Sequence, residues 1–322
     1  MAQISPAGYN AAFYAWDTMY QQAYLEPQTF YQEFASIIPS TTDTQVHLWM
    51  DVLPSLSQWQ GDRFISSLEG RAYKLQNQLY QSSFSVQRAA IEDDQYGMYA
   101  ARIQMLARAA KKWPDQVVTT AVQNGLTALC FDGQPFFGTH PQDMSNPNSP
   151  TYSNRFDASV TGGGIGFPLN AQNLLTVTQA MMAYKGADNA PLGVIPTHLL
   201  VPPQLWGTAQ QLTQLQLIAQ AVGSNVAATQ SSVTQGMLKP LLNTYFADQS
   251  RWYVLAVDGP LKPFIWQIRN PAEMSFLNRP DDYNSWTRDE WLFGVRGRGA
   301  AGYSLPFLAA TASPNATSPN AT

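Results

Sequence analysis

Aromatic side chains crowd the first forty residues of the chain. Phe13, Trp16 and Tyr20 are spaced at i, i+3 and i+7, which places them on one face of a helix. Pro27 interrupts this pattern, and the polar run that begins at Pro39 ends it. A helix face with so many aromatic side chains must pack on another surface. The sequence leaves two candidates for that surface, the chain's own core and a neighbouring subunit.

The pattern becomes extended between residues 57 and 90. Polar and larger side chains alternate through residues 83–88, which is the period of two typical of a β-strand. We predict that residues 58–65 and 73–88 are the arms of a long β-hairpin that turns at Glu69-Gly70-Arg71. Because an isolated two-stranded ribbon is marginally stable in water, this hairpin should lie on another surface.

A helical pattern follows from about Ile91 to Lys112. Trp113-Pro114-Asp115 should break this helix, and a further helix should continue until Gly125. The apolar residues of the first helix fall on one stripe, made of Tyr96, Tyr99, Ile103, Leu106 and Ala110.

Three acids, Glu92, Asp93 and Asp94, open this predicted helix, and basic residues crowd its last turn. That polarity complements the helix macrodipole, and an Asp near the start can cap free backbone amides. A catalytic or metal-binding role would need a partner base, a nucleophile or further ligands, and the chain's three histidines show no ligand spacing. We therefore interpret the acids as the start of a structural spine helix, and expect no catalytic, cofactor or metal site.

The second half of the chain mixes shorter elements. Residues 173–184 and 204–222 are predicted helices, and residues 197–202 frame a short buried strand. Residues 251–257 and 263–268 read as a strand pair, and residues 290–303 as one last strand.

Composition narrows the function classes. Charged residues make up 12% of the 322 residues, against roughly 25% in typical soluble domains, which favours a subunit that hides its surface against copies of itself. A net charge of −4 and a pI near 5.3 argue against tight nucleic-acid binding. Cys130 is the single cysteine and is predicted to be a buried thiol, so no internal disulfide forms. No apolar run of ~18 residues predicts a membrane span.

Two polar motifs offer alternative chemistry. Asp132 and His140 fall in one loop-like stretch and would suit a hydrolase that also uses the acids at 92–94, but no nucleophile elbow or metal-ligand set accompanies them. The glycine run at 162–166 lacks the Lys and Ser/Thr of a phosphate-binding loop and is interpreted as a linker.

A series of short motifs runs between residues 40 and 310: Trp59-Gln-Gly-Asp-Arg63, Ile91-Glu-Asp-Asp94, Tyr96-Gly-Met-Tyr99, Asp132-Gly-Gln-Pro-Phe-Phe137, His140-Pro141, Pro191-Leu-Gly193, Leu200-Val-Pro-Pro203, Trp252-Tyr-Val-Leu255, Pro263-Phe-Ile265, Phe293-Gly-Val-Arg296 and Gly302-Tyr303. In this set and this order, the motifs resemble those of the major head subunit family of Mu-like bacteriophages.

The resemblance implies an α+β Johnson fold, the major-capsid fold of tailed phages and herpesviruses. The parts it implies are an N-terminal arm (1–40), a connection (41–56), an extended β-hairpin loop (57–90), a peripheral domain with a long spine helix (91–164), an axial domain (165–285), a return strand to the peripheral domain (286–312) and a C-terminal tail (313–322).

The function implied by the resemblance is structural. The chain would be a major capsid protein that self-assembles as hexamers and pentamers into the icosahedral head around double-stranded DNA, bound without sequence specificity. It would work with a portal, possible decoration proteins and a separate scaffolding protein. The scaffold is expected because the chain given reaches its aromatic arm directly after Met1, with no long charged pre-segment. It would assemble in the host cytoplasm and reside in the virion.

Residues expected at assembly interfaces are aromatic or basic side chains of the arm and the hairpin, namely Phe13, Trp16, Tyr20, Trp59, Arg63, Tyr73 and Arg88. Two alternatives to a phage head remain open besides the hydrolase. One is a cage of the encapsulin type, which shares the Johnson fold, and the other is a different structural protein of the virion.

Overall fold

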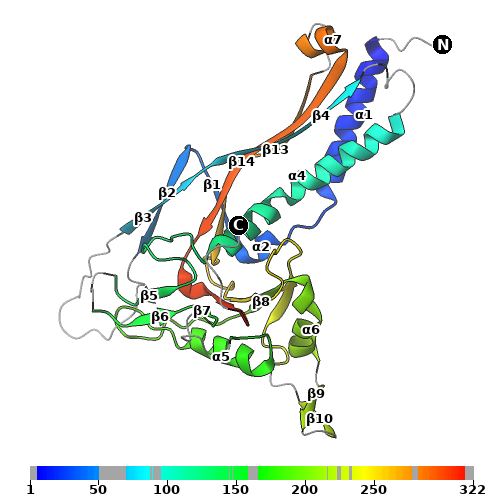
Figure 1. The fold of residues 1–322 in the computed structure, drawn as a ribbon. Coiled ribbons are helices and arrows are strands. Elements are labelled where there is room, and N and C mark those ends of the chain that lie inside the picture. Colours follow the sequence, from blue (N-terminus) through cyan, green and yellow to red (C-terminus); the bar gives the residue numbers. More distant parts are fainter. Residues whose placement is uncertain are drawn as a thin grey trace.

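The computed structural model describes residues 6–50, 70–87, 89, 96–144, 146, 148–158, 166–215, 217–222, 226–231, 234–277 and 282–315. A long arm of helices and strands rises from a wider body, with the N-terminus near the far end of the arm and the C-terminal segment in the body (Figure 1). Helices and mainly antiparallel sheets are mixed, as expected for the predicted α+β class.

A four-stranded sheet runs the length of the arm. Its strands, in spatial order, are β1 (Ala35–Pro39), β13 (Phe264–Leu277), β14 (Glu290–Tyr303) and β4 (Gln78–Gln87). The β1–β13 pair is parallel and the other pairs are antiparallel. Alternate residues of β14 are buried, so the predicted strand at 290–303 is present and turns one face toward the helices.

Helices α1 (Pro6–Leu25) and α4 (Tyr96–Asn124) pack together along that face. The predicted stripe of α4 is confirmed where its side chains are described: Tyr99, Ile103 and Ala110 are buried with Trp291 and Phe293 of β14. The predicted break at Pro114 is wrong, because one helix continues to Asn124 with Pro114 inside it. Tertiary packing on both sides of the proline offsets its local cost, since residues before it and after it belong to buried clusters.

A five-stranded sheet forms the body. Its strands, in spatial order, are β11 (Lys239–Leu242), β8 (His198–Val201), β12 (Trp252–Leu255), β15 (Ala309–Ala312) and β7 (Arg155–Phe156). Trp252 and Val254 point to a cluster with α5 (Ala171–Met182) and α6 (Trp206–Gln214). Tyr253 and Leu255 point the other way, into the main cluster with the C-terminal part of α4. Both faces are therefore covered, which explains the unbroken apolar runs in this half of the sequence.

Three expectations about the second half are corrected. Residues 251–257 and 263–268 do not pair: β12 lies in the body sheet and β13 in the arm sheet. The helix predicted over 204–222 ends at Gln214, because residues 217–222 form strand β9 (Leu217–Val222) against β10 (Val226–Ser231). The strand at 290–303 is also not the last, since β15 follows it.

The strands of the predicted hairpin have other partners in the structure. Strand β3 (Gly70–Gln76) pairs with β2 (Thr44–Met50) in a two-stranded ribbon, so Gly70-Arg71 lies within a strand rather than in a turn. The predicted first arm at 58–65 lies outside the described residues, and residues 73–76 of the predicted second arm pair with β2. Strand β4 leaves this ribbon after Asn77 and joins the arm sheet beside β14. The period of two at residues 83–87 did identify a strand, but its partner is distant in sequence.

The remaining elements are short. They are α2 (Tyr31–Phe34), β5 (Thr139–Pro141), β6 (Thr151–Ser153), η1 (Pro203–Leu205), α7 (Tyr283–Arg288) and η2 (Pro306–Leu308). Helix α7 caps the far end of the β13–β14 hairpin (Figure 1).

Candidate assembly surfaces and a buried Cys-Asp-His cluster

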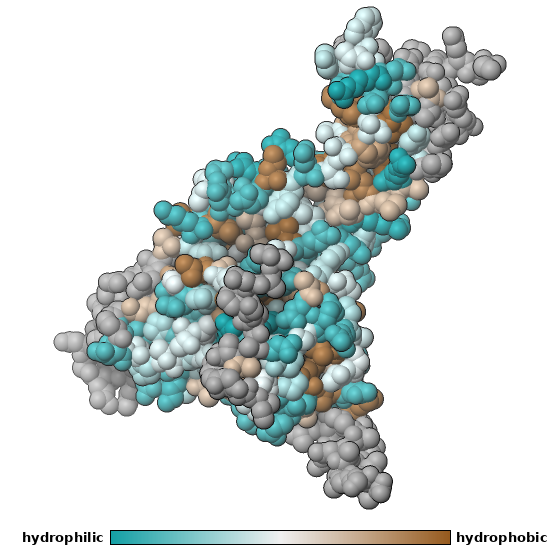
Figure 2. Space-filling view, viewed as in Figure 1, coloured by the Kyte–Doolittle hydropathy of each residue, from teal (hydrophilic) through white to brown (hydrophobic). Residues whose placement is uncertain are grey.

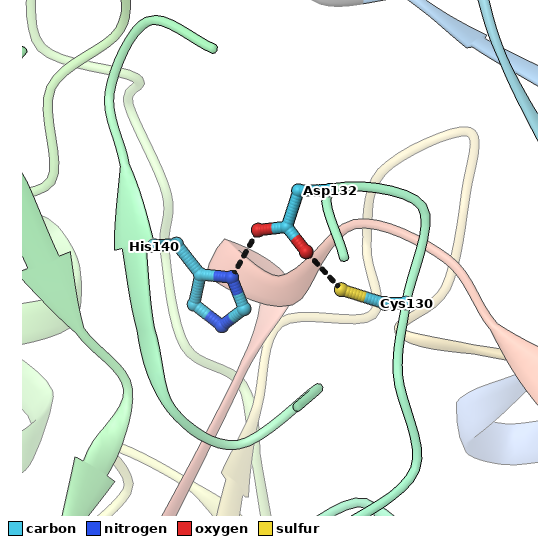
Figure 3. A group of neighbouring side chains, drawn as sticks. All are labelled: Cys130, Asp132 and His140. Carbon is cyan, nitrogen blue, oxygen red and sulfur yellow. Dashed lines mark hydrogen bonds and ion pairs between the residues drawn. The ribbon is translucent and has the colours of Figure 1, made fainter. Parts of the chain in front are cut away.

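Cys130 and Asp132, in the segment between α4 and β5, meet His140 of β5 (Figure 3). The Cys130 thiol donates to Asp132 Oδ1 at 2.8 Å, and His140 Nδ1 lies 2.5 Å from Asp132 Oδ2. A turn at Asp132-Gly133 makes this geometry possible because Gly133 has a φ of +77°. The side chains of His140 and Asp132 are 1% and 2% exposed, so the cluster is closed to solvent.

Burial sets the charge state of the cluster. It raises the pKa of the Cys130 thiol well above its usual value, and the neighbouring Asp132 raises it further. Burial by itself would also raise the pKa of Asp132, but the hydrogen bonds and charge of His140 lower it below its usual value. The carboxylate is thus the acceptor at the centre, and the thiol keeps its proton.

This arrangement does not suit catalysis. Nucleophilic catalysis by cysteine needs a base in contact with the thiol, whereas here Asp132 lies between Cys130 and His140 (Figure 3). The other ring nitrogen of His140 faces the Phe136 carbonyl at 3.2 Å rather than an open cleft. The structure therefore gives Asp132 and His140, two of the residues of the hydrolase alternative, a packing role.

A metal ion is the other chemistry that these residue types allow. Sulfur, nitrogen and carboxylate oxygen are all zinc ligands, and the three ligand atoms lie within 4.8 Å of one another. However, the same atoms already hydrogen-bond to each other, and a closed structural zinc site takes four ligands rather than three. The absence of a metal stays a prediction.

Two residues expected at interfaces are buried within the chain. Trp16 and Tyr20 are 3% and 1% exposed, and the Trp16 ring lies edge-on to Phe293 with centroids 5.4 Å apart. The sequence left two candidates for the surface on which the N-terminal aromatic face packs. For these two side chains that surface is the chain's own core. They pack there because α1 lies along α4 and β14.

The other interface candidates are mostly outside the description. Tyr73 is half-buried on β3 and packs against the main cluster, so its interface role stays a prediction. Trp59, Arg63 and Arg88 lie outside the described residues, as does the side chain of Phe13.

The acids Glu92, Asp93 and Asp94 also lie outside the described residues, and the described helix α4 begins at Tyr96. The basic half of the dipole argument is wrong. Because α4 continues to Asn124, Arg108 and Lys111 lie in its middle. There Arg108 pairs at 2.7 Å with Glu26, the residue after α1, and the Lys111 ammonium lies over the ring of Tyr24 in α1.

Exposed apolar side chains mark surfaces that sequence reasoning missed. Trp286 and Tyr283 of α7 are 85% and 78% exposed at the far end of the arm. On the ribbon, Val46 and Leu48 are exposed on one face of β2. Figure 2 shows hydrophobic residues at the surface of both arm and body. The signal for α7 was available in the sequence, since two aromatics stand in a strongly polar stretch.

A groove lies between α4 and the strands β3 and β14. It has a volume of about 640 Å³, and its lining includes Tyr80, Trp113 and Tyr303 but no charged residue. A groove without charges can cover an apolar segment without burying an unpaired ion.

Comparison with known proteins identifies relatives over most of the chain. The family model described as Mu-like prophage major head subunit gpT matches residues 9–163, 164–238 and 229–321. The chain is 26% identical over 286 residues to the Mu-like prophage FluMu major head subunit of Haemophilus influenzae, a match that covers 68% of this chain and 93% of the relative. It is 23% identical over 302 residues to the major capsid protein of Escherichia phage Mu, covering 94% and 72%.

Solved structures agree with these relatives. The chain superposes on a subunit of the procapsid of bacteriophage JBD30 with a TM-score of 0.56 and 25% identity, over 98% of this chain and 77% of that one.

Proposed function

Because the chain belongs to the family of Mu-like prophage major head subunits, we propose that it assembles as hexamers and pentamers into an icosahedral head around double-stranded DNA. It has the Johnson fold and is a major capsid protein, a structural protein of the virion rather than an enzyme. Self-assembly into a shell follows from that membership. The capsomer types and the enclosed DNA are the proposal.

The observation that carries the proposal is the set of apolar surfaces that a lone subunit leaves uncovered. The ribbon presents Val46 and Leu48, and the arm ends in Trp286. Large apolar surfaces of this kind are typical of obligate assemblies, where neighbouring copies bury them. We infer that the ribbon lies on an adjacent subunit in the shell.

The charge balance supports packaged DNA held without specific contacts. With a net charge of −4, the subunit lacks the clustered Lys and Arg that tight DNA binding needs. A separate scaffolding protein, a portal and decoration proteins are further proposed partners. None of the described helices is long and apolar enough to span a membrane.

The second candidate is a cage of the encapsulin type, which shares the fold. The contents of the native particle distinguish a phage head from such a cage. The test is expression of the full chain with the assembly factors of its phage, followed by light scattering and electron cryo-microscopy. Closed shells or capsomers are the expected products, and native particles should contain DNA. A stable monomer under these conditions overturns the assembly proposal, and enzyme cargo in native particles favours the cage.

A further inference from the structure

Asn77 lies at the point where the ribbon joins the arm sheet, and it is almost fully buried. It is the single residue between β3, which belongs to the ribbon, and β4, which belongs to the arm sheet. Its backbone amide donates to the Asp43 carbonyl at 3.0 Å, directly before β2 begins. The exit and the return of the ribbon are therefore joined at one place.

The Asn77 side chain extends this junction. Its Nδ2 donates to Ser40 Oγ at 2.9 Å, to the Thr42 carbonyl at 2.9 Å and to the Asp43 carbonyl at 3.2 Å. These three acceptors belong to the loop that links β1 to β2. One buried amide thus holds the whole loop against the start of β4.

Gln267 continues the network into the middle of the arm sheet. This fully buried residue of β13 donates from Nε2 to Asn77 Oδ1 at 2.8 Å, and its Oε1 lies 2.9 Å from His47 Nε2 on the inner face of β2. The hydrogen bonds between these side chains all run in one direction, from His47 through Gln267 and Asn77 to Ser40. Each carboxamide therefore accepts from the side chain before it and donates to the side chain after it.

The order of the strands in the arm sheet shows which elements this network connects. Strands β1 and β4 are the two edges of the arm sheet, and the ribbon is attached to both of them. The network of Ser40, Asn77, Gln267 and His47, which we name the amide hub, connects both edges, the central strand β13 and the ribbon. A two-stranded ribbon has little rigidity of its own, so its direction depends on its attachment.

We propose that the amide hub fixes the direction in which the β2–β3 ribbon leaves the arm sheet, and thereby sets the angle at which the ribbon meets an adjacent copy of this chain. The second half of this statement rests on the proposed function, because it requires the ribbon to contact a neighbour. Asn77 is a positioning residue: it acts through the ribbon and makes no intersubunit contact itself.

The test compares Asn77→Ala with Gln78→Ala in the full chain. Gln78 is the next residue and also carries a carboxamide, but it is exposed. Asn77→Ala removes the side-chain donors and keeps the backbone bond to Asp43. Amide exchange in strands β2 and β3 should become at least tenfold faster in Asn77→Ala than in Gln78→Ala. The substitution removes all four hydrogen bonds of the Asn77 side chain, and a net loss equal to about one buried hydrogen bond already corresponds to about tenfold. Shells of Asn77→Ala should have a broader distribution of diameters, while Gln78→Ala matches the wild type.

The outcomes separate the hub from the proposed function. Equal ribbon exchange in the two variants overturns the hub, whether or not shells form. Faster exchange with unchanged shell diameters overturns its role in assembly. If wild-type subunits build no shells, the assembly half fails together with the proposed function, and the exchange data still decide the hub. Should Asn77→Ala fail to fold, Ser40→Ala takes its place with the same criteria; it removes the hydroxyl that accepts from Asn77 Nδ2 and donates to the Thr42 carbonyl.

Discussion

Asp115 holds the backbone of Tyr31: its Oδ1 accepts a hydrogen bond from the Tyr31 amide at 2.9 Å, and from the Phe30 amide at 3.1 Å. A side chain in the middle of α4 thus satisfies the first amides of α2 and anchors the N-terminal segment where it crosses to β1. Asp115 is 1% exposed, so these bonds are shielded from water.

Replacing Asp115 by Ala should leave both amides without an acceptor and cost roughly 1–3 kcal/mol for each group that stays buried. Asp115→Asn keeps a carbonyl oxygen at the same place and should cost much less. Burial raises the pKa of Asp115 despite these hydrogen bonds, so the neutral amide also avoids the desolvation of a charge. Chemical denaturation of the two variants checks the order. Equal losses would show that the oxygen is not the anchor.

The Asp132–His140 pair should give the subunit a dependence on acid pH. Because the folded-state pKa of Asp132 is lowered below 3.8, its stabilisation is present above that value and is lost as pH falls through the folded pKa. Asp132→Asn should cost about 3–5 kcal/mol at neutral pH, as for a broken buried pair, and the difference from wild type should shrink in acid.

Melting temperatures of both proteins across the acid range measure this. The exposed Asp258→Asn is the matched control and should follow the wild type at every pH. A difference between Asp132→Asn and wild type that does not change with pH would contradict the charged pair.

The acids at 92–94 and Ile103 test the structural interpretation of the spine helix. If the acids only start the helix, each change to Ala should cost ~1 kcal/mol for a dipole contact, or up to ~2 kcal/mol for an N-cap, and appear as lower shell thermostability.

Ile103→Asp should prevent assembly, since Ile103 is fully buried and an unpaired charge there costs several kcal/mol. Met105→Asp on the same helix is the control, because Met105 is 70% exposed. An acid variant that assembles and melts normally but abolishes infectivity would instead show a binding or chemical role.

Trp286 should matter for association and not for folding. Since its side chain is 85% exposed, Trp286→Ser should leave the melting temperature of the subunit nearly unchanged while lowering the yield of shells. Trp291→Ser, at a buried position of the same hairpin, should lower the melting temperature first. Full shell yield from Trp286→Ser would remove α7 from the proposed interfaces.

Local patterns in the sequence predicted single elements better than their partners. The stripe around Ile103 and the alternation at Phe84 and Val86 each reported a buried face correctly, because burial repeats with the geometry of one helix or strand. The partner of β4 could not be read from its own residues, since β14 lies far away in the sequence. The same reason defeated the pairing of residues 251–257 with 263–268, where nearness in the chain suggested a hairpin.

Tertiary contacts also overrode local signals. Pro114 is a strong helix breaker, yet Trp113 packs against Trp266 and over Gly297, and the helix continues through the proline. Asp132 and His140 were noted in the sequence and not assigned to a catalytic site, but the contact between their side chains could not be predicted. Only the geometry shows Asp132 between the other two groups and sealed from solvent.

The parallel pairing of β1 with β13 has a consequence for synthesis. A ribosome releases Ala35 long before its partner Phe264, and the arm cluster around Trp16 and Tyr20 is completed only by Trp291 and Phe293. The nascent chain must therefore carry an aromatic helix face uncovered until nearly all of it has emerged. Such non-local topologies fold slowly and expose apolar surface on the way. Cells that make this subunit in bulk should depend on chaperones that shield its early residues during translation.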